Sequence, residues 1–144
     1  MKIAIQKLTP TAILPKRMTE HSSGFDLFAD ILESVIFEPF QRIAIPCGIA
    51  VEIPIGYEAQ IRPRSGLSLS SGLGVLNSPG TIDSDYRGEI KVILFNISDK
   101  VVMIEPQMRI AQMVFCPVMI PELCETSILS PSIRQEGGFG HTGK

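Results

Sequence analysis

Apolar and polar residues alternate along most of this chain with a period of two, which is typical of β-strands with one face buried. The clearest example is the segment of residues 49–54, in which every second side chain is isoleucine or valine. Further strand-like runs are found at residues 3–8, 25–28, 35–37, 42–45, 57–62, 89–97, 101–104 and 109–120. Turn-forming residues such as Asn77-Ser78-Pro79-Gly80 separate these runs. Many short strands at this spacing predict an all-β fold of the sandwich, barrel or jelly-roll type.

Helical periodicity is confined to one short segment, residues 65–71, which Gly72 would end and for which Ser65 would be the N-cap. Residues 134–144 contain four glycines and no periodic pattern, so we expect a flexible arm. A disordered tail without function is the alternative interpretation. Because no repeat or linker divides the rest of the sequence, we predict one β domain at 1–133 followed by an arm at 134–144.

The composition narrows the range of functions. At 144 residues, 44% hydrophobic and 19% charged, the chain is large and apolar enough to form one ordered domain. A mean hydropathy of +0.24 fits the burial of some surface against other subunits. The net charge of −2 gives no reason to expect a nucleic-acid or membrane-surface partner. Three cysteines without a CxxC pair and the lack of a signal sequence are consistent with a cytoplasmic protein.

The first candidate site is Arg64-Ser65-Gly66, at the predicted start of the helix. Arginine can bind phosphate oxygens in bidentate fashion, and glycine lets a ligand approach the backbone closely. Unpaired amides at a helix start also favour an anion. The alternative is an ordinary strand end that carries solvated arginines.

The second candidate site lies between Gly74 and Lys91. After the turn that ends at Gly80, Asp83 and Asp85 fall on the same side of an extended chain. A carboxylate close to a phosphate can act as a general base toward water. An acidic hairpin loop in solvent is the competing interpretation.

Taken together, these segments resemble the trimeric dUTPases. Five ordered motifs carry the resemblance: Ser23-Gly24-Phe25-Asp26-Leu27, Arg64-Ser65-Gly66, the stretch from Gly80 to Gly88, Arg109-Ile110-Ala111-Gln112, and residues 134–143. The resemblance implies a β jelly roll, a homotrimer with shared active sites, Mg²⁺, and hydrolysis of dUTP to dUMP and pyrophosphate. Such an activity keeps uracil out of DNA and supplies dUMP for dTMP synthesis.

The resemblance also implies roles for individual residues. Asp83 would deprotonate the water that attacks the α-phosphorus, and Asp26 would hold Mg²⁺ through water while the metal bridges the triphosphate. The expected phosphate contacts are Arg64, Ser65, Gly66 and Gln112. The expected pocket for uracil and deoxyribose is the hairpin that carries Asn77, Thr81, Ile82, Asp83, Tyr86 and Lys91. The arm, through Arg134, Phe139, Gly140, His141 and Thr142, would close over the site of a neighbouring subunit.

The sequence departs from the family pattern at His141, where a serine is usual, so this residue is either a phosphate contact or a spectator. Three other functions compete with dUTP hydrolysis. They are dCTP deamination within the same superfamily, a catalytically silent nucleotide-binding module, and a purely structural jelly roll. Retention of Asp26, Asp83 and the arm argues against the silent module, and a structural role explains none of the five motifs.

Overall fold

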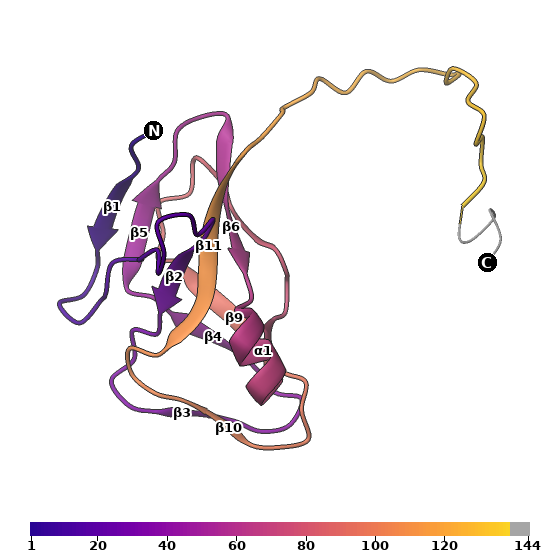
Figure 1. The fold of residues 1–144 in the computed structure, drawn as a ribbon. Coiled ribbons are helices and arrows are strands. Elements are labelled where there is room, and N and C mark those ends of the chain that lie inside the picture. The colour runs from indigo at the N-terminus through magenta and orange to yellow at the C-terminus, as the bar shows by residue number, and fades with distance from the viewer. Residues whose placement is uncertain (139–144) are drawn as a thin grey trace.

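The computed structural model describes residues 1–138 of the chain, and these residues form an antiparallel β structure with one short helix (Figure 1). The elements are β1 (Ala4–Lys7), β2 (Phe25–Phe28), β3 (Val35–Phe37), β4 (Arg42–Pro46), β5 (Ile49–Glu52), β6 (Tyr57–Arg62), α1 (Ser65–Ser71), β7 (Leu73–Val75), β8 (Gly80–Ile82), β9 (Lys91–Asn96), β10 (Val102–Ile104) and β11 (Arg109–Pro117). The prediction of an all-β fold with one short helix is confirmed.

Two sheets and two ribbons make up the body. One sheet has the strand order β2-β11-β6-β8 and the other has the order β4-β9-β7, while β1 pairs with β5 and β10 with β3. The strands pair mostly with partners distant in sequence, and every recorded pairing is antiparallel. The strand order places β8 at one edge of its sheet, so that one row of its backbone groups is not used by β6.

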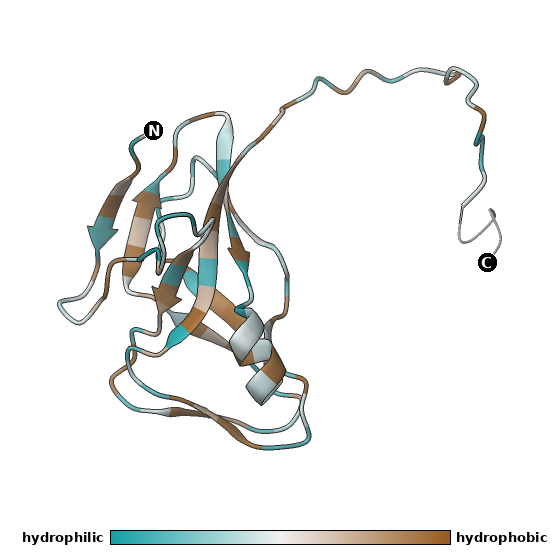
Figure 2. Ribbon diagram, viewed as in Figure 1, coloured by the Kyte–Doolittle hydropathy of each residue, from teal (hydrophilic) through white to brown (hydrophobic). Residues whose placement is uncertain are grey.

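The alternating pattern buries one set of side chains in a single core. Leu27, Phe37, Ile45, Ile49 and Leu94 are among its fully buried members. Figure 2 shows hydrophobic positions distributed along the strands of the body and also along the segment that follows β11. That segment leaves the body in an extended conformation (Figure 1), and several of its large apolar side chains are exposed, including Met119 and Leu123. None of the helices described is long and apolar enough to cross a membrane.

The helix begins where it was expected, but its N-cap is not Ser65. Arg64 is the N-cap, in an extended conformation with φ −93° and ψ 123°, and no side-chain hydrogen bond caps the helix. The reason is that the Arg64 carbonyl already accepts the first helical hydrogen bond, from the Ser68 amide at 3.0 Å. Ser65 therefore lies in the first turn and is exposed. Gly72 ends the helix with φ 68°, a left-handed conformation that glycine adopts without strain.

Cys47 is buried in the core with 1% of its surface exposed. Burial foremost, and then the negative charges of Glu89 and Asp30, raise the pKa of this thiol from 9.0 to about 12. In the unfolded chain the thiol loses its proton above its ordinary pKa, whereas in the folded chain it stays neutral. A rise in pH through this window therefore favours the unfolded chain.

We predict that Cys47→Ala removes the part of the stability loss at alkaline pH that comes from the Cys47 thiol. The free energy of unfolding in urea, measured at fixed protein concentration, should fall more steeply for the parent protein than for the variant across the window from 9.0 to about 12. Cys124→Ala is the matched control, because Cys124 is exposed and should leave the pH profile unchanged. Parallel profiles for the parent and Cys47→Ala would contradict the prediction.

Candidate functional site

Asp26 is the centre of a charged cluster at one end of the β2-β11-β6 sheet. β11 lies between the two other strands and places Gln112 opposite both Asp26 and Arg62. Residues opposite one another in a ladder point to the same face of the sheet, so these three side chains share a face. An irregularity in the register between Arg109 and Ala111 interrupts the alternation of β11 close to this point.

Two arginines bind the Asp26 carboxylate, which is nearly buried at 9% exposure. Arg109 Nη1 lies 3.1 Å from Asp26 Oδ2, and Arg64 Nε lies 3.4 Å from the same oxygen. Arg64 Nη1 also donates to the Arg109 carbonyl at 3.1 Å. The cluster thus combines two positive charges with one negative charge, and the remaining positive charge favours an anion beside it.

Gln112 is held at the same end of the sheet. Its Nε2 donates to the Pro63 carbonyl at 3.0 Å. Gly24 lies directly beneath it, since a Cβ at Gly24 would collide with the Gln112 amide oxygen. Gln112 also lines a cleft of about 480 Å³ together with Gln60, Arg62, Pro63, Ser78 and Pro79. The glycine of the first sequence motif therefore makes room for the glutamine of the fourth.

Ser65 and Gly66 extend this cluster at the first turn of α1, and both are exposed. A Cβ at Gly66 would meet no atom within 4 Å, so nothing in the body itself demands a glycine there. Amides in the first turn of a helix have no partner within the helix. The arrangement offers backbone N–H groups to an anion held by Arg64.

The hairpin after β8 forms a second site. Thr81, Ile82, Asp83, Tyr86 and Lys91 line one pocket of about 320 Å³. The Tyr86 hydroxyl donates to the Glu89 carbonyl at 3.0 Å. Gly88 lies against the Tyr86 ring so closely that a Cβ there would collide with it. The ring is therefore fixed as one wall of the pocket.

Three further residues line this pocket: Ala44, Glu89 and Ile93. The sequence motifs do not reveal them. Ile93 could have been found, because it lies two positions after Lys91 on the same strand and so on the same face. Ala44 could not have been found from the sequence, since only the pairing of β4 with β9 brings it opposite Ile93. Asn77, expected in this pocket, is not among its lining residues, and its amide lies close to Gly80 instead.

The two sites lie far apart within one chain. Ile82 pairs with Ala59 of β6, and Arg64 follows Ala59 by five residues of extended chain. At the rise per residue of a strand, Arg64 lies roughly 16 Å along the chain from Ala59. Asp83 follows Ile82 on the antiparallel strand and so lies still farther from Arg64. Asp83 therefore does not reach a phosphate that Arg64 of the same chain binds.

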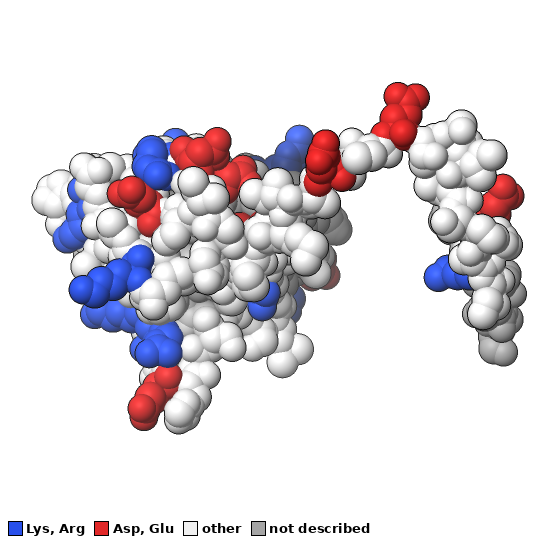
Figure 3. Space-filling view, turned by 90° about the horizontal axis from the view of Figure 1, so that it is seen from above, with Lys and Arg blue, Asp and Glu red and all other residues white. Residues whose placement is uncertain are grey.

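Side chains of both signs lie on the face of the body shown in Figure 3, where several Lys and Arg side chains gather toward one side, and the net charge of the chain is −2. Binding of a phosphate chain therefore depends on the local arginines. In the part of the chain that the structure describes, no three His, Cys, Asp or Glu side chains group together as a metal site. In the charged cluster the carboxylate is that of Asp26, and both of its ion pairs use Oδ2.

The arm expected at residues 134–144 is described only as far as Gly138. Arg134 Nε donates to the Gly137 carbonyl at 2.6 Å, and Arg134 is exposed. Phe139, Gly140, His141 and Thr142 lie outside the described residues.

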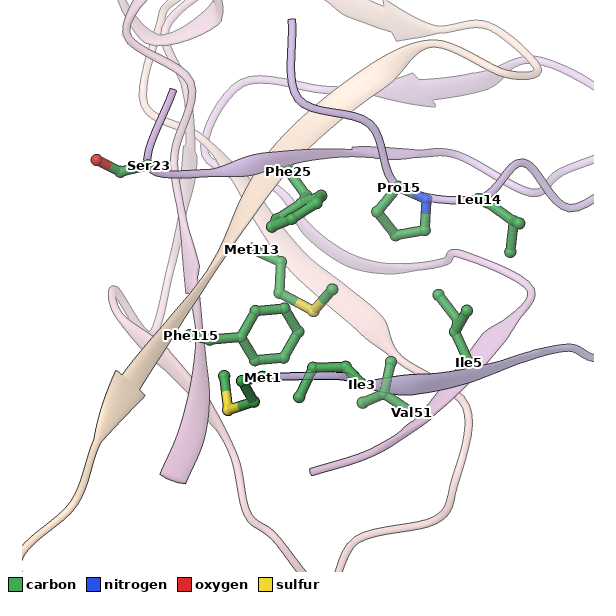
Figure 4. A pocket seen from close by; sticks show the side chains of 10 residues that line it. All are labelled: Met1, Ile3, Ile5, Leu14, Pro15, Ser23, Phe25, Val51, Met113 and Phe115. Atoms are coloured by element: carbon green, nitrogen blue, oxygen red, sulfur yellow. The ribbon is translucent and has the colours of Figure 1, made fainter. Parts of the chain in front are cut away.

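An apolar pocket of about 470 Å³ lies between β1 and the β2-β11 face (Figure 4). Its lining residues are Met1, Ile3, Ile5, Leu14, Pro15, Ser23, Phe25, Val51, Met113 and Phe115. Phe25 and Phe115 meet edge to face, with ring centroids 6.0 Å apart. Because none of the lining side chains is charged, this pocket does not suit phosphate chemistry.

Comparison with known proteins shows one consistent relationship. The chain matches the family described as dUTPase over residues 11–143. It is 57% identical over 143 residues to a deoxyuridine 5'-triphosphate nucleotidohydrolase of Hydrogenobaculum sp. (strain Y04AAS1), covering 99% of each chain. It is 51% identical over 144 residues to the protein of the same name from Nautilia profundicola, covering 100% of each.

Solved structures that resemble this chain are also dUTPases. A mutant dUTPase of Staphylococcus bacteriophage 80alpha with dUpNHpp has a TM-score of 0.89 and 28% identity, with 99% of each chain covered. A mutant dUTPase from phage phi11 of S. aureus, described with a structural Mg(II) ion, has a TM-score of 0.82 at 24% identity and shares the fold. It covers 91% of this chain and 100% of that one.

We predict that Asp26→Asn lowers the free energy of unfolding, because it leaves two neighbouring guanidinium groups without their shared carboxylate. The loss should be about 1–3 kcal/mol, between the values for an exposed pair and a buried one. Urea unfolding measures it. Glu52→Gln is the control, since it breaks the exposed ion pair with Arg87 and should cost less than about 1 kcal/mol. Equal losses in the two variants would contradict the prediction.

Proposed function

The chain belongs to the dUTPase family and hydrolyses dUTP as a dUTP diphosphatase, and we propose that Asp83 is the general base of this reaction. The observation that carries the proposal is the pocket in which Asp83 lies beside Tyr86 and the edge strand β8. In the cell this activity keeps uracil out of DNA and supplies dUMP for dTMP synthesis.

The hairpin pocket suits a pyrimidine base with its sugar. The unused backbone row of β8 can pair with the O4 acceptor and the N3–H donor of uracil, with further contacts at Thr81 and Ile82. Cytosine has a donor where uracil has its acceptor and an acceptor where uracil has its donor. Binding of cytosine would therefore leave polar atoms of the site unpaired, so the site rejects cytosine strongly. The Tyr86 ring packs under the deoxyribose, where a 2′-hydroxyl would collide. Lys91 lines the same pocket, and Asn77, whose amide lies close to Gly80 at the start of β8, would contribute from beside it.

The charged cluster suits the triphosphate. Arg64 binds its oxygens, the Ser65 hydroxyl and the Gly66 amide approach the α–β bridge, and Gln112 contacts the β-phosphate. The ion pair with Asp26 and the hydrogen bond to the Arg109 carbonyl hold the Arg64 guanidinium in place before substrate arrives. Such preorganisation means that little rearrangement is needed during the reaction.

The chemistry is the attack of a water on the α-phosphorus. Asp83 accepts a proton from this water as the new oxygen–phosphorus bond forms. The bond from the α-phosphorus to the bridging oxygen breaks, and pyrophosphate leaves with its charge matched by the arginines. Asp83 lines an open pocket and needs only to orient the water and take its proton.

Magnesium is the expected metal. A single carboxylate, Asp26, with no cluster of further ligands in the described residues, fits a cation that keeps its waters and binds mainly the substrate phosphates. Bound Mg²⁺ would neutralise part of the charge of the triphosphate. The Asp26 carboxylate would hold the metal ion through water. Both of its ion pairs with arginine use Oδ2.

A complete site requires more than one copy of the chain, and we propose a homotrimer. The separation of Asp83 from Arg64 supports this, because the base pocket of one copy must meet the phosphate cluster of another. The extended segment after β11, with exposed apolar residues such as Leu123, supports contact with a neighbour. Its last residues, Arg134 and Phe139 to Thr142, would close over the shared site, with Phe139 stacked on uracil. A cytoplasmic location and the absence of nucleic-acid and membrane partners stay predictions.

We predict that Asp83→Asn lowers kcat for dUTP by roughly 10²–10⁴-fold, the usual contribution of a general base. Pyrophosphate release from dUTP, dCTP, dTTP and UTP with Mg²⁺ would be measured for the parent and the variant. The parent should act on dUTP far better than on the other three. Asp99→Asn, an exposed carboxylate in the turn after β9, is the control and should match the parent. Equal rates for Asp83→Asn and the parent would refute the role of Asp83.

A further inference from the structure

Arg87 turns back onto the loop that carries Asp83. Its Nη1 donates to the Ser84 carbonyl at 2.7 Å and to the Tyr86 carbonyl at 3.0 Å. The Tyr86 amide donates to the Asp83 carbonyl at 3.2 Å. These three hydrogen bonds close the segment from Asp83 to Arg87 into a compact turn.

The Asp83 carboxylate depends on this turn for its direction. Within residues 1–138, no hydrogen bond or ion pair is recorded for the Asp83 side chain, which is exposed. Its position is therefore set by its own backbone and by the peptide group that follows it. Arg87 holds the next carbonyl in the chain, that of Ser84, and so fixes the backbone just beyond Asp83.

The Tyr86 side chain, in contrast, is held in place by contacts that do not involve Arg87. Its hydroxyl donates to the Glu89 carbonyl, and its ring rests on Gly88. Glu89 is anchored in turn, because its carboxylate accepts the Gly48 amide at 3.1 Å. Loss of the Arg87 guanidinium should thus loosen Asp83 and Ser84 while the wall formed by Tyr86 remains.

The other contact of Arg87 is weaker. Arg87 Nη2 lies 3.8 Å from Glu52 Oε1 at the end of β5, and both side chains are more than half exposed. Exposed pairs of this kind contribute little. Glu52 orients the guanidinium, whereas the bonds to the two carbonyls hold the turn.

We propose that Arg87 is a positioning residue for dUTP hydrolysis, which acts by fixing the turn that aims Asp83 at the water. The inference rests on the proposed function of Asp83. Arg87 touches neither the substrate nor the water in this account, so its effect falls on the chemical step. Substrate binding, which depends on Tyr86 and the edge of β8, is largely preserved.

Steady-state kinetics of Arg87→Met with dUTP test the proposal. Misplacement of a catalytic group by about 1 Å costs roughly 10²-fold, so kcat should fall by about that factor. KM should stay within about fivefold of the parent, which is the signature of a lost transition-state interaction. Arg87→Lys should recover much of kcat, because an ammonium can donate to both carbonyls. The thermal midpoint of Arg87→Met should stay close to that of the parent, since Arg87 is exposed.

Two matched variants isolate the cause. Glu52→Gln removes the ion pair but keeps both carbonyl bonds, and its kcat should fall by less than about fivefold. Arg42→Met removes another exposed arginine, on β4, and should behave as the parent.

Three results would overturn the proposal. The first is parent-like kcat in Arg87→Met while Asp83→Asn is inactive, which rejects the positioning role and leaves the role of Asp83 intact. The second is an Arg87→Met protein that fails to fold, or that loses thermal stability and kcat together without rescue by lysine, which makes Arg87 purely structural. The third is full activity of Asp83→Asn, which removes the proposed function on which the inference depends.

Discussion

The antiparallel pairing of β6 with both β11 and β8 is the constraint on which the rest of the molecule depends. On one side, β11 brings Gln112 level with Arg62 and so gathers the charged cluster at the end of β6. On the other side, the register that sets Ile82 opposite Ala59 sends Asp83 toward the other end of the same strand. One strand therefore organises both sites and also keeps them apart.

Because of this separation, one chain that carries all five motifs would not form a complete site by itself, which is the reason for the proposed trimer. Arg64 is preset by Asp26 and by a backbone carbonyl, and Tyr86 is preset by Gly88 and Glu89. The Arg64 guanidinium and the Tyr86 ring are thus held in place before substrate binds. In the proposed trimer, joining the two sites across subunits would position the α-phosphorus without a large rearrangement within either site. The exposed apolar residues after β11 provide surface for such an assembly.

The sequence predicted the fold class and the alternating strands, because a period of two with buried isoleucines and valines is a strong local signal. It missed β7 (Leu73–Val75) and β8 (Gly80–Ile82), because each of these short strands contains a glycine, whereas the equally short β3 consists of Val, Ile and Phe and was predicted. Placing Ser65 at the N-cap was wrong because the Arg64 carbonyl takes the first helical bond. The position of Ala44 in the pocket and the ion pair between Arg109 and Asp26 both depend on pairing between strands distant in sequence. No local sequence pattern reveals such pairing.

The most direct test of the shared site is to combine two variants that are each expected to be inactive. Asp83→Asn keeps the phosphate cluster, and Arg64→Met keeps the base pocket and its carboxylate. When the two chains are unfolded together and refolded as mixed assemblies, some sites should combine an intact hairpin with an intact cluster, and dUTP hydrolysis should return. Mixed assemblies that form but stay as inactive as either variant alone would contradict the account.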